Sequence, residues 1–436
     1  MRVRRLLSIT LLLGLAGGAA QSSFGYSVLT HQQIIDLAWR ESIRPVLLSR
    51  YPNTTDAELQ RAQSYAYGGC AIQDEGYYPF GHEFFSQLTH YVRTGDFVAA
   101  LIRDARDVDE LAFALGALSH YVGDNYGHQD ATNPSTAIEF PDLAAKYGPV
   151  VTYDESPHGH VRTEFAFDVN QLSKRRFAPS AYLQHIGLRV PARLLDQAFY
   201  DTYGLPLHSI VRDRRAATRS YRWAVRTFVP DFAYGEVLLH RKSMPADLPT
   251  PDFELFQKRL QDADFANHWE QYRKKPGIRT HLVAFLILIV PKIGPMSYLA
   301  IRGPNQETEE KYVESVNRTL ARYEAILARL DAEPGTDPEA VMALENRDLD
   351  TGNPVRPGSY PLTDKTYARL LDKLVKEDTA VPESLRQDVE NYYADPNAPI
   401  ATRRNAKAWR RVQAELVTLK AMPSANGTPA PVHGAE

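Results

Sequence analysis

A nonpolar run that leads into evenly spaced metal-ligand side chains most strongly limits how this chain can fold. Residues 111–118 read LAFALGAL, which is typical of a helix in a protein core. His120, Asp124 and His128 follow at intervals of four residues, and this spacing places them on one face of a helix. The stretch therefore predicts a buried helix that ends in a ligand-bearing face. A hydrogen-bonded core histidine beside a polar helix end would give the same pattern.

The two histidines of this stretch are too far apart to bind one ion. A helix rises about 1.5 Å per residue, so His120 and His128 would lie roughly 12 Å apart along its axis. Zinc binds nitrogen at about 2 Å. Asp124 lies between them and has two carboxylate oxygens, so neighbouring ions could share it. The spacing therefore implies two ions.

Composition and charge place the chain among globular proteins. Its 436 residues are 44% hydrophobic, enough for a sizeable core and for two or three domains at most. Residues 1–25 contain three arginines and no acidic residue, so the remainder has 47 basic against 53 acidic residues, a net charge of −6. This balance disfavours broad attraction to nucleic acid, and we expect no stable nucleic-acid partner. The single cysteine, Cys70, excludes an internal disulfide.

The N-terminus has the pattern of a secretory signal peptide. A basic start precedes a nonpolar run over residues 6–16 and then small residues, and the run is too short for a convincing membrane span. Cleavage could follow Ala20, or it could follow Gly25, which would make Tyr26 the new N-terminus. We expect residues 1–25 to be the signal peptide of a secreted or periplasmic protein.

The rest of the sequence predicts an all-α protein. Helical spacing of hydrophobic residues begins at Thr30, a plausible N-cap, and is interrupted at residues 65–81, where glycines and aromatics indicate a loop. Asn133–Ser135 would end the central helix region. Residues 165–270 have a helical pattern throughout. Later helices are expected at 307–331, 363–376, 382–394 and 400–421.

A change in composition after Pro304 suggests a domain boundary. We expect a catalytic domain over residues 26–303, a helical C-terminal region over 304–422 with a loop at 333–360, and a disordered tail over 423–436. The nonpolar residues 282–301 are broken by two prolines. They would form either a buried helix or a peripheral contact with a membrane.

Histidines and acidic residues that could bind metal are concentrated in the first third of the chain. The candidate ligands are His31, Asp74, His90, His120, Asp124, His128, His160 and Glu164, with His158 as a further possibility. Imidazole and carboxylate groups suit zinc, and this set is sufficient for two ions and nearly for three. An N-terminal amine freed by signal cleavage could supply one more nitrogen. Motifs of other catalytic mechanisms are absent, so a metal-activated water is the best available nucleophile.

These residues resemble the zinc-dependent phospholipase C family, which shares a superfamily with fungal single-strand-specific nucleases. The resemblance covers about residues 26–170 by motif and is expected to extend to about residue 240. It is carried by His120 with Asp124, by His160 with Glu164, by the upstream Asp74 and His90, and by an aromatic residue five places before His31. It implies an all-α, multi-helix catalytic bundle that binds three zinc ions, followed here by an added helical region.

The resemblance also implies which residues hold each ion. Asp74, His90, His120 and Asp124 would hold one zinc, and His128, His160 and Glu164 a second. Asp124 would bridge to a third zinc, held by His31 and by the amine and carbonyl of Tyr26, where the family usually has tryptophan. Asp74 would also act as general base. Because the family's gap between the aspartate and the next histidine is usually longer, His158 or Asp130 could replace His128.

The implied activity is that of a secreted zinc phosphodiesterase that cleaves phospholipids to diacylglycerol and a phosphorylated head group. One alternative is a nuclease of the same superfamily, although Glu164 favours the phospholipase because the nucleases have aspartate there. Another is a non-catalytic metal-binding protein whose C-terminal region binds a partner. Tyr77, Tyr78 and Phe80 could stack on a quaternary ammonium head group.

Overall fold

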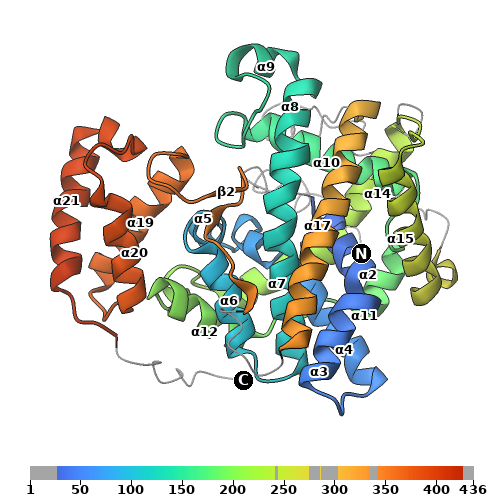
Figure 1. Ribbon diagram of the computed structural model, residues 1–436, viewed down its shortest axis with the longest axis horizontal. Helices are drawn as coiled ribbons and strands as arrows, with labels where there is room; N and C mark the ends of the chain where they lie inside the picture. The colour runs from blue at the N-terminus through green and yellow to red at the C-terminus, as the bar shows by residue number, and fades with distance from the viewer. Residues whose placement is uncertain (1–26, 241–243, 274–284, 286–302, 334–340, 426–436) are drawn as a thin grey trace, which may run out of the picture.

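The computed structural model describes residues 27–240, 244–273, 285, 303–333 and 341–425 (Figure 1). Within these residues the protein is helical, as predicted, apart from a two-stranded antiparallel hairpin of β1 (Arg347–Asp348) and β2 (Asn353–Pro354) and an isolated bridge. The expected signal peptide, Tyr26 and residues 426–436 lie outside the described residues. So does the nonpolar stretch 282–301, apart from residue 285.

The helices of the main body and of the C-terminal end can be given in chain order. The α-helices of the body are α2 (Val28–Ala38), α3 (Arg44–Arg50), α4 (Asp56–Gly69), α5 (Glu83–Tyr91), α6 (Thr94–Asp104), α7 (Val108–Tyr126), α8 (Asn133–Glu139), α9 (Pro141–Tyr147), α10 (Pro157–Ser173), α11 (Ser180–Ile186), α12 (Ala192–Tyr203), α13 (Arg214–Trp223), α14 (Val229–His240), α15 (Pro251–Asn267) and α17 (Gln306–Ala332). The C-terminal α-helices are α19 (Pro361–Glu377), α20 (Glu383–Ala394) and α21 (Ala406–Ala421). The short 3₁₀ and π helices are η1 (Trp39–Ile43), η2 (Ile72–Tyr77), η3 (Gly127–Thr132), η4 (Leu207–Ser209), η5 (Ala224–Phe228), η7 (Trp269–Tyr272) and η9 (Ala401–Arg404).

Helix α7 is the central element of the body, and α2, α4, α6 and α17 pack around it (Figure 1). Residues 111–118 are buried, as the nonpolar run predicts. Two glycines allow α4 and α7 to cross closely. A Cβ on Gly69 would lie 2.0 Å from the Phe113 carbonyl oxygen, and one on Gly116 would lie 2.2 Å from that of Ala66. Larger side chains would therefore push the two helices apart.

The structure corrects the expected end of the central helix. Residues 127–132 form the π-helical turn η3, and α8 continues directly from it at Asn133. Pro134 does not end the helical path, because it follows directly on the wider π-helical turn and lies in the first turn of α8, where proline is tolerated. The direction of the chain is therefore kept beyond His128.

Two further boundaries differ from the expectation. Part of the expected loop at 65–81 is helical, because α4 extends to Gly69 and η2 follows. Helix α2 begins at Val28 rather than after Thr30. The Asp168 carboxylate accepts hydrogen bonds from the backbone N–H groups of Leu29 (3.0 Å) and Thr30 (3.1 Å). These bonds satisfy donors that a helix N-terminus leaves without an internal partner.

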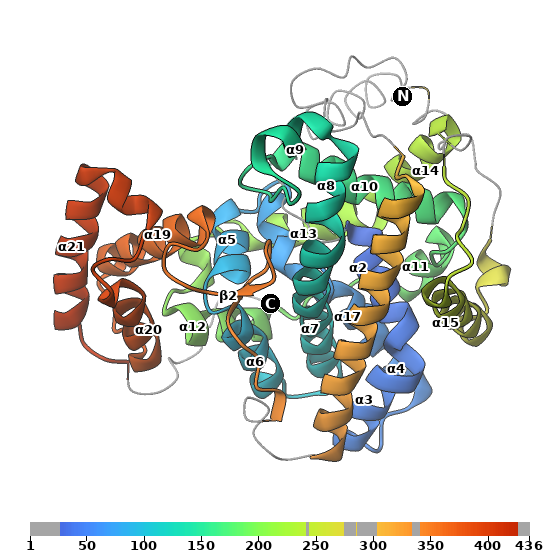
Figure 2. The same ribbon diagram turned by 45° about the horizontal axis from the view of Figure 1, so that its top comes forward.

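The expected C-terminal region does not behave as one unit. Its first helix, α17, lies along α7, α2 and α3 in both ribbon views (Figures 1 and 2). The Tyr323 hydroxyl donates to the Leu115 carbonyl at 2.8 Å, inside the core. Helices α19, α20 and α21 form a smaller group at the side of the body, where α19 packs against α5. Helix α17, although it follows Pro304, therefore packs with helices that precede Pro304, and the domain boundary stays a prediction.

The beginning of the expected disordered tail is ordered. The N–H of Val381 donates to the Pro423 carbonyl, and the N–H of Ala425 donates to the Val381 carbonyl, both at 3.0 Å. These bonds hold residues 423–425 against the segment before α20.

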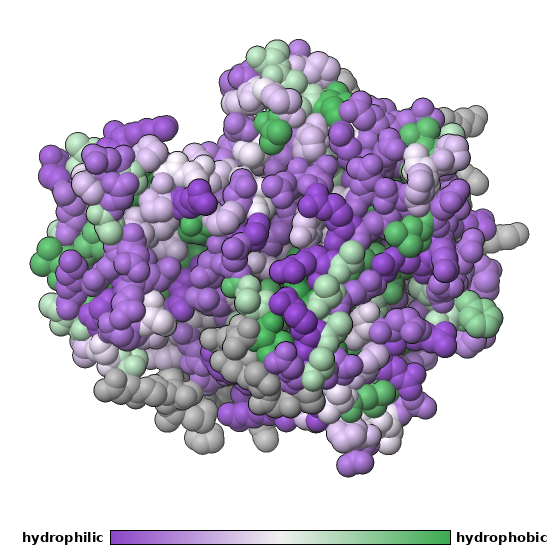
Figure 3. Space-filling view, viewed as in Figure 1, coloured by the Kyte–Doolittle hydropathy of each residue, from purple (hydrophilic) through white to green (hydrophobic). Residues whose placement is uncertain are grey.

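The surface seen in Figure 3 is mostly hydrophilic, with hydrophobic residues in small separate patches. None of the helices in the described ranges has both the length and the nonpolar character needed to cross a membrane.

Candidate metal centre

Five separate parts of the fold bring the eight predicted ligand side chains together. His31 projects from α2, Asp74 from η2 and His90 from α5. Helix α7 and the adjoining η3 carry His120, Asp124 and His128, and α10 carries His160 and Glu164. All eight side chains are buried, none more than 1% exposed. They form three groups. Within each group, the ligand atoms lie within 4.8 Å of one another.

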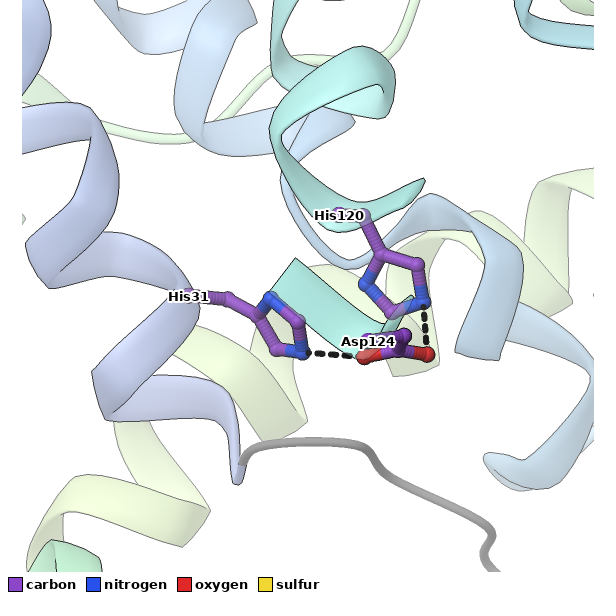
Figure 4. A group of neighbouring side chains, drawn as sticks. All are labelled: His31, His120 and Asp124. Carbon is purple, nitrogen blue, oxygen red and sulfur yellow. Dashed lines mark ion pairs between the residues drawn. The ribbon is translucent and has the colours of Figure 1, made fainter. Parts of the chain in front are cut away.

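Two of these groups share His120. One contains His31, His120 and Asp124, and the other contains Asp74, His90 and His120. Figure 4 shows His31 and His120 on opposite oxygens of Asp124, with Nε2–Oδ distances of 3.3 and 3.1 Å. His90 Nε2 lies 3.3 Å from Asp74 Oδ1 and 3.4 Å from Asp124 Oδ2. We call these five side chains the first cluster.

The third group, His128, His160 and Glu164, forms the second cluster. Glu164 Oε1 lies 3.3 Å from His128 Nε2 and 2.7 Å from His160 Nε2. His160 and Glu164 reach the same point because they are four residues apart on α10, as their spacing predicts. The second cluster therefore joins the end of the α7–η3 path to a single helix.

The alternatives to His128 are not needed. His128 lies in the π-helical turn η3, and the wider π turn changes the direction of side chains relative to a regular helix. This accounts for a ligand only four residues beyond Asp124. Asp130 instead forms an ion pair with Arg318, with Oδ2 2.7 Å from Nη1. His158 belongs to none of the three groups found among the described residues.

Backbone carbonyls orient the histidines of the first cluster. His120 Nδ1 lies 3.1 Å from the Cys70 carbonyl oxygen, and His90 Nδ1 lies 2.8 Å from that of Ser86. A carbonyl oxygen can only accept, so each Nδ1 carries the proton. Each Nε2 then presents its lone pair to the cluster, as metal-binding histidines require.

The second cluster is oriented by a residue that the sequence analysis did not single out. His128 Nδ1 donates to the carbonyl oxygen of Leu349, 2.5 Å away. A backbone carbonyl has no side-chain signature, so no motif could have identified it. Asp168, which fixes the start of α2 three residues before His31, was also missed. Asp168 lies four residues after Glu164 on α10, and this helical spacing could have indicated that the two side chains share a face.

Three buried carboxylates provide a test of whether these residues fit a metal. Both oxygens of Asp74, Asp124 and Glu164 are buried and accept no hydrogen bond from any residue in the described part of the chain. Buried carboxylates without donors are unfavourable unless a cation compensates them. Since their neighbours are imidazole nitrogens, the donor set suits zinc.

The charges within the clusters are strongly coupled. Burial raises the pKa of Asp124, but where no metal occupies the site the positive charge and N–H groups of the neighbouring imidazoles, His120 first, would hold that pKa well below its usual value. Burial raises the pKa of Glu164 well above its usual value, although His128 opposes this. Protons and metal ions therefore compete for the same nitrogen and oxygen atoms.

The three aromatic residues expected near a head group do not converge. The Tyr77 ring lies 6.1 Å from that of His90, and Tyr78 packs 5.6 Å from Tyr221 in the interior. Phe80, in contrast, is 69% exposed. Tyr78 is therefore a core residue, and a head-group contact by Tyr77 and Phe80 stays a prediction.

Comparison with known proteins identifies the part of the chain that carries both clusters. Residues 30–210 match the family model described as zinc dependent phospholipase C. No curated protein and no solved structure matches the chain significantly. The matched range includes all eight ligand side chains and ends before α13, so α17 and everything after it lie outside. The chain is therefore similar to the zinc-dependent phospholipase C family over residues 30–210, which hold both clusters.

Proposed function

We propose that this chain is a secreted enzyme that hydrolyses phospholipids to diacylglycerol and a phosphorylated head group. The observation that carries the proposal is the presence of three buried ligand groups, two of which share His120, within the matched residues. A phosphodiester has anionic oxygens that need compensating positive charge while water attacks phosphorus. Several divalent ions beside one another can provide it.

The proposed site holds three zinc ions. Asp74, His90, His120 and Asp124 would hold the first, and the second cluster would hold the second. Asp124 and His31 would contribute to a third, for which Tyr26 would supply its amine and carbonyl after signal cleavage. Bound zinc would lower the pKa of a nearby water and stabilise charge on the phosphoryl group.

Asp74 is the proposed general base. Its side chain lies in the interior of the site, where neither oxygen accepts a hydrogen bond from a described residue. It would take a proton from the water that attacks phosphorus. The bond between phosphorus and the diacylglycerol oxygen then breaks, and the leaving oxygen takes up a proton.

Secretion is part of the proposal because the third zinc needs a new N-terminus. Cleavage after Gly25 would leave the amine of Tyr26 next to Ser27, which immediately precedes α2. Asp168 holds the next turn of the chain through Leu29 and Thr30. Release into the periplasm or the medium, and peripheral membrane contact through residues 282–301, stay predictions.

A single set of measurements on the secreted protein tests the proposal. Its N-terminal sequence should begin at Tyr26, and its metal content should be three zinc ions per chain. Phosphatidylcholine vesicles should release diacylglycerol, and a chelator should stop the reaction until zinc is added back. Single-stranded DNA, incubated in parallel, should remain intact.

Other outcomes would overturn the proposal in distinct ways. Cleavage of the DNA but not of the lipid would make the chain a nuclease of the same superfamily. Bound zinc without hydrolysis of any phosphodiester would favour a metal-binding protein without turnover. A matched control is His185→Ala, which removes an exposed histidine outside the three ligand groups and should change neither zinc content nor activity.

A further inference from the structure

A short segment from the C-terminal half of the chain lies against the second cluster. Residues 345–354, here called the strap, contain β1, β2 and the turn between them. We propose that the strap is a positioning element for the metal site, because it sets the orientation of His128 and joins it to the helix that carries His90. This inference rests on the proposed binding of zinc by the second cluster.

Leu349 connects the strap to both clusters through its backbone. Its carbonyl oxygen accepts the His128 Nδ1 hydrogen bond at 2.5 Å, and its N–H donates to the carbonyl oxygen of His90 at 3.0 Å. His128 Nε2 is thereby directed toward Glu164 Oε1, 3.3 Å away. One strap residue thus contacts a ligand from each cluster.

Asp350 fixes the strap from the other side of the turn. Its side chain is fully buried, and Oδ2 accepts hydrogen bonds from the hydroxyls of Tyr91 (2.8 Å) and Tyr360 (2.7 Å). Its carbonyl accepts from Asn133 Nδ2 at 2.7 Å, at the point where η3 passes into α8. Asp350 therefore links Tyr91, which follows His90 in the chain, to Asn133, which follows the turn η3 that carries His128.

The conformation of the strap is specified at its turn and at its start. Asp348 Oδ1 accepts from the N–H groups of Asp350 and Thr351 at 3.0 and 3.1 Å. Gly352 has a φ of +69°, and a Cβ there would lie 2.4 Å from the Asn125 carbonyl oxygen on α7. Only glycine allows this approach, so the strap is seated directly against the helix that carries Asp124.

Several hydrogen bonds attach the start of the strap to the body. Thr94 Oγ1 donates to the Arg347 carbonyl at 2.8 Å, and the hydroxyl of Tyr121 donates to the Glu345 carbonyl at 2.6 Å. The strap is thus fixed to α6 and α7 before it reaches the second cluster.

The hydrogen bond to the second nitrogen of a metal-binding histidine sets its tautomer and ring orientation. Loss of such a partner costs about 10–100-fold in metal affinity or activity. His90 and His120 obtain theirs from carbonyls within the matched residues, whereas His128 obtains its own from Leu349, outside them. The strap thus supplies part of the site's geometry from beyond the matched region.

The test compares Asp350→Asn with Asp364→Asn in the full secreted chain. Asp364 is also buried and accepts a tyrosine hydroxyl, that of Tyr392, but it lies among α19 to α21. Zinc affinity is measured by competition with chelators of graded strength. We expect Asp350→Asn to weaken the binding of one zinc ion about 10–100-fold and to leave the affinity for the other ions unchanged. Asp364→Asn should leave all of them unchanged, and circular dichroism checks that both variants fold.

Tyr360→Phe provides a milder test if Asp350→Asn fails to fold, because it removes one of the two hydroxyl donors. It should weaken the same zinc by a smaller factor. Equal zinc affinities in wild type and in the folded strap variants would overturn the strap proposal alone. A wild-type second cluster that binds no zinc would instead overturn the proposed function. Similar zinc loss in Asp364→Asn would mean general destabilisation and would also reject the role of the strap.

Discussion

The two clusters use the same ligand types but are supported differently. The first cluster draws its five side chains from α2, η2, α5 and α7, and its members are linked because His120 and Asp124 each contact several of the others. The second cluster has three side chains from η3 and α10, and it depends on Leu349 for the orientation of His128. The packing of N-terminal helices is therefore sufficient to orient His90 and His120, whereas His128 requires a distant segment of the chain.

The largest expected effect comes from Asp124→Asn, because this carboxylate contacts His31, His90 and His120. The amide cannot offer two anionic oxygens. We expect loss of two zinc ions and a fall in phosphodiesterase activity of about 10³-fold, equivalent to about 4 kcal/mol of transition-state stabilisation. Metal analysis and initial rates would measure this. Asp142→Asn, at an exposed aspartate, is the control, and full zinc content in Asp124→Asn would contradict the shared role.

Glu164→Gln tests whether the clusters are separable. The change removes the only carboxylate of the second cluster. One zinc should be lost while the first cluster remains loaded, and activity should fall about 100-fold, or about 2.7 kcal/mol. Metal analysis of the purified variant gives the stoichiometry. Loss of every zinc would mean that the two clusters bind cooperatively and that the contrast between them is wrong.

Asp36 is a buried carboxylate that belongs to neither cluster, and it sharpens the comparison. It accepts a hydrogen bond from Tyr67, and burial raises its pKa to about 8 in the folded protein, against 3.8 as its usual value. The folded state therefore holds a proton that the unfolded chain releases. The contribution of this proton to the free energy of unfolding is complete below about pH 4, and it is lost as the pH rises toward 8.

Asp36→Asn should remove this pH dependence without removing the contact to Tyr67. Between pH 5 and 8, the unfolding free energy of wild type should fall relative to that of the variant by up to about 4 kcal/mol. Denaturant unfolding at fixed zinc concentration measures the difference, and the shared contribution of the metal cancels. Parallel pH profiles of the two proteins would mean that Asp36 is ionised in the folded state, like Asp124.

Gly123→Ala should have the smallest effect and should act on the first cluster alone. A Cβ at this position would lie 3.3 Å from Ile34 Cδ1 and 3.4 Å from His31 Nδ1. The imidazole must then shift by a few tenths of an ångström. We expect zinc binding at His31 to weaken a few-fold, on the order of 1 kcal/mol, and zinc binding at the second cluster to stay unchanged. Chelator competition would detect this, and an equal weakening at both clusters would contradict it.

The sequence by itself determined the local parts of the site. A spacing of four residues places His120 with Asp124, and His160 with Glu164, on one face of a helix whatever the rest of the chain does. The nonpolar run before His120 likewise requires burial. The resemblance then assigned the ligands on other elements to a common site, and the structure brings the described ones together.

Only the tertiary structure decided how those parts are held in place. The amphipathic pattern of α17 predicts that the helix packs, but it does not specify that its partners are α2, α3 and α7. Residues 333–360 have the composition of a loop, yet Leu349 within them orients His128. A backbone carbonyl is the same in every residue, so its contribution depends on where the folded chain places it and leaves no mark in the sequence.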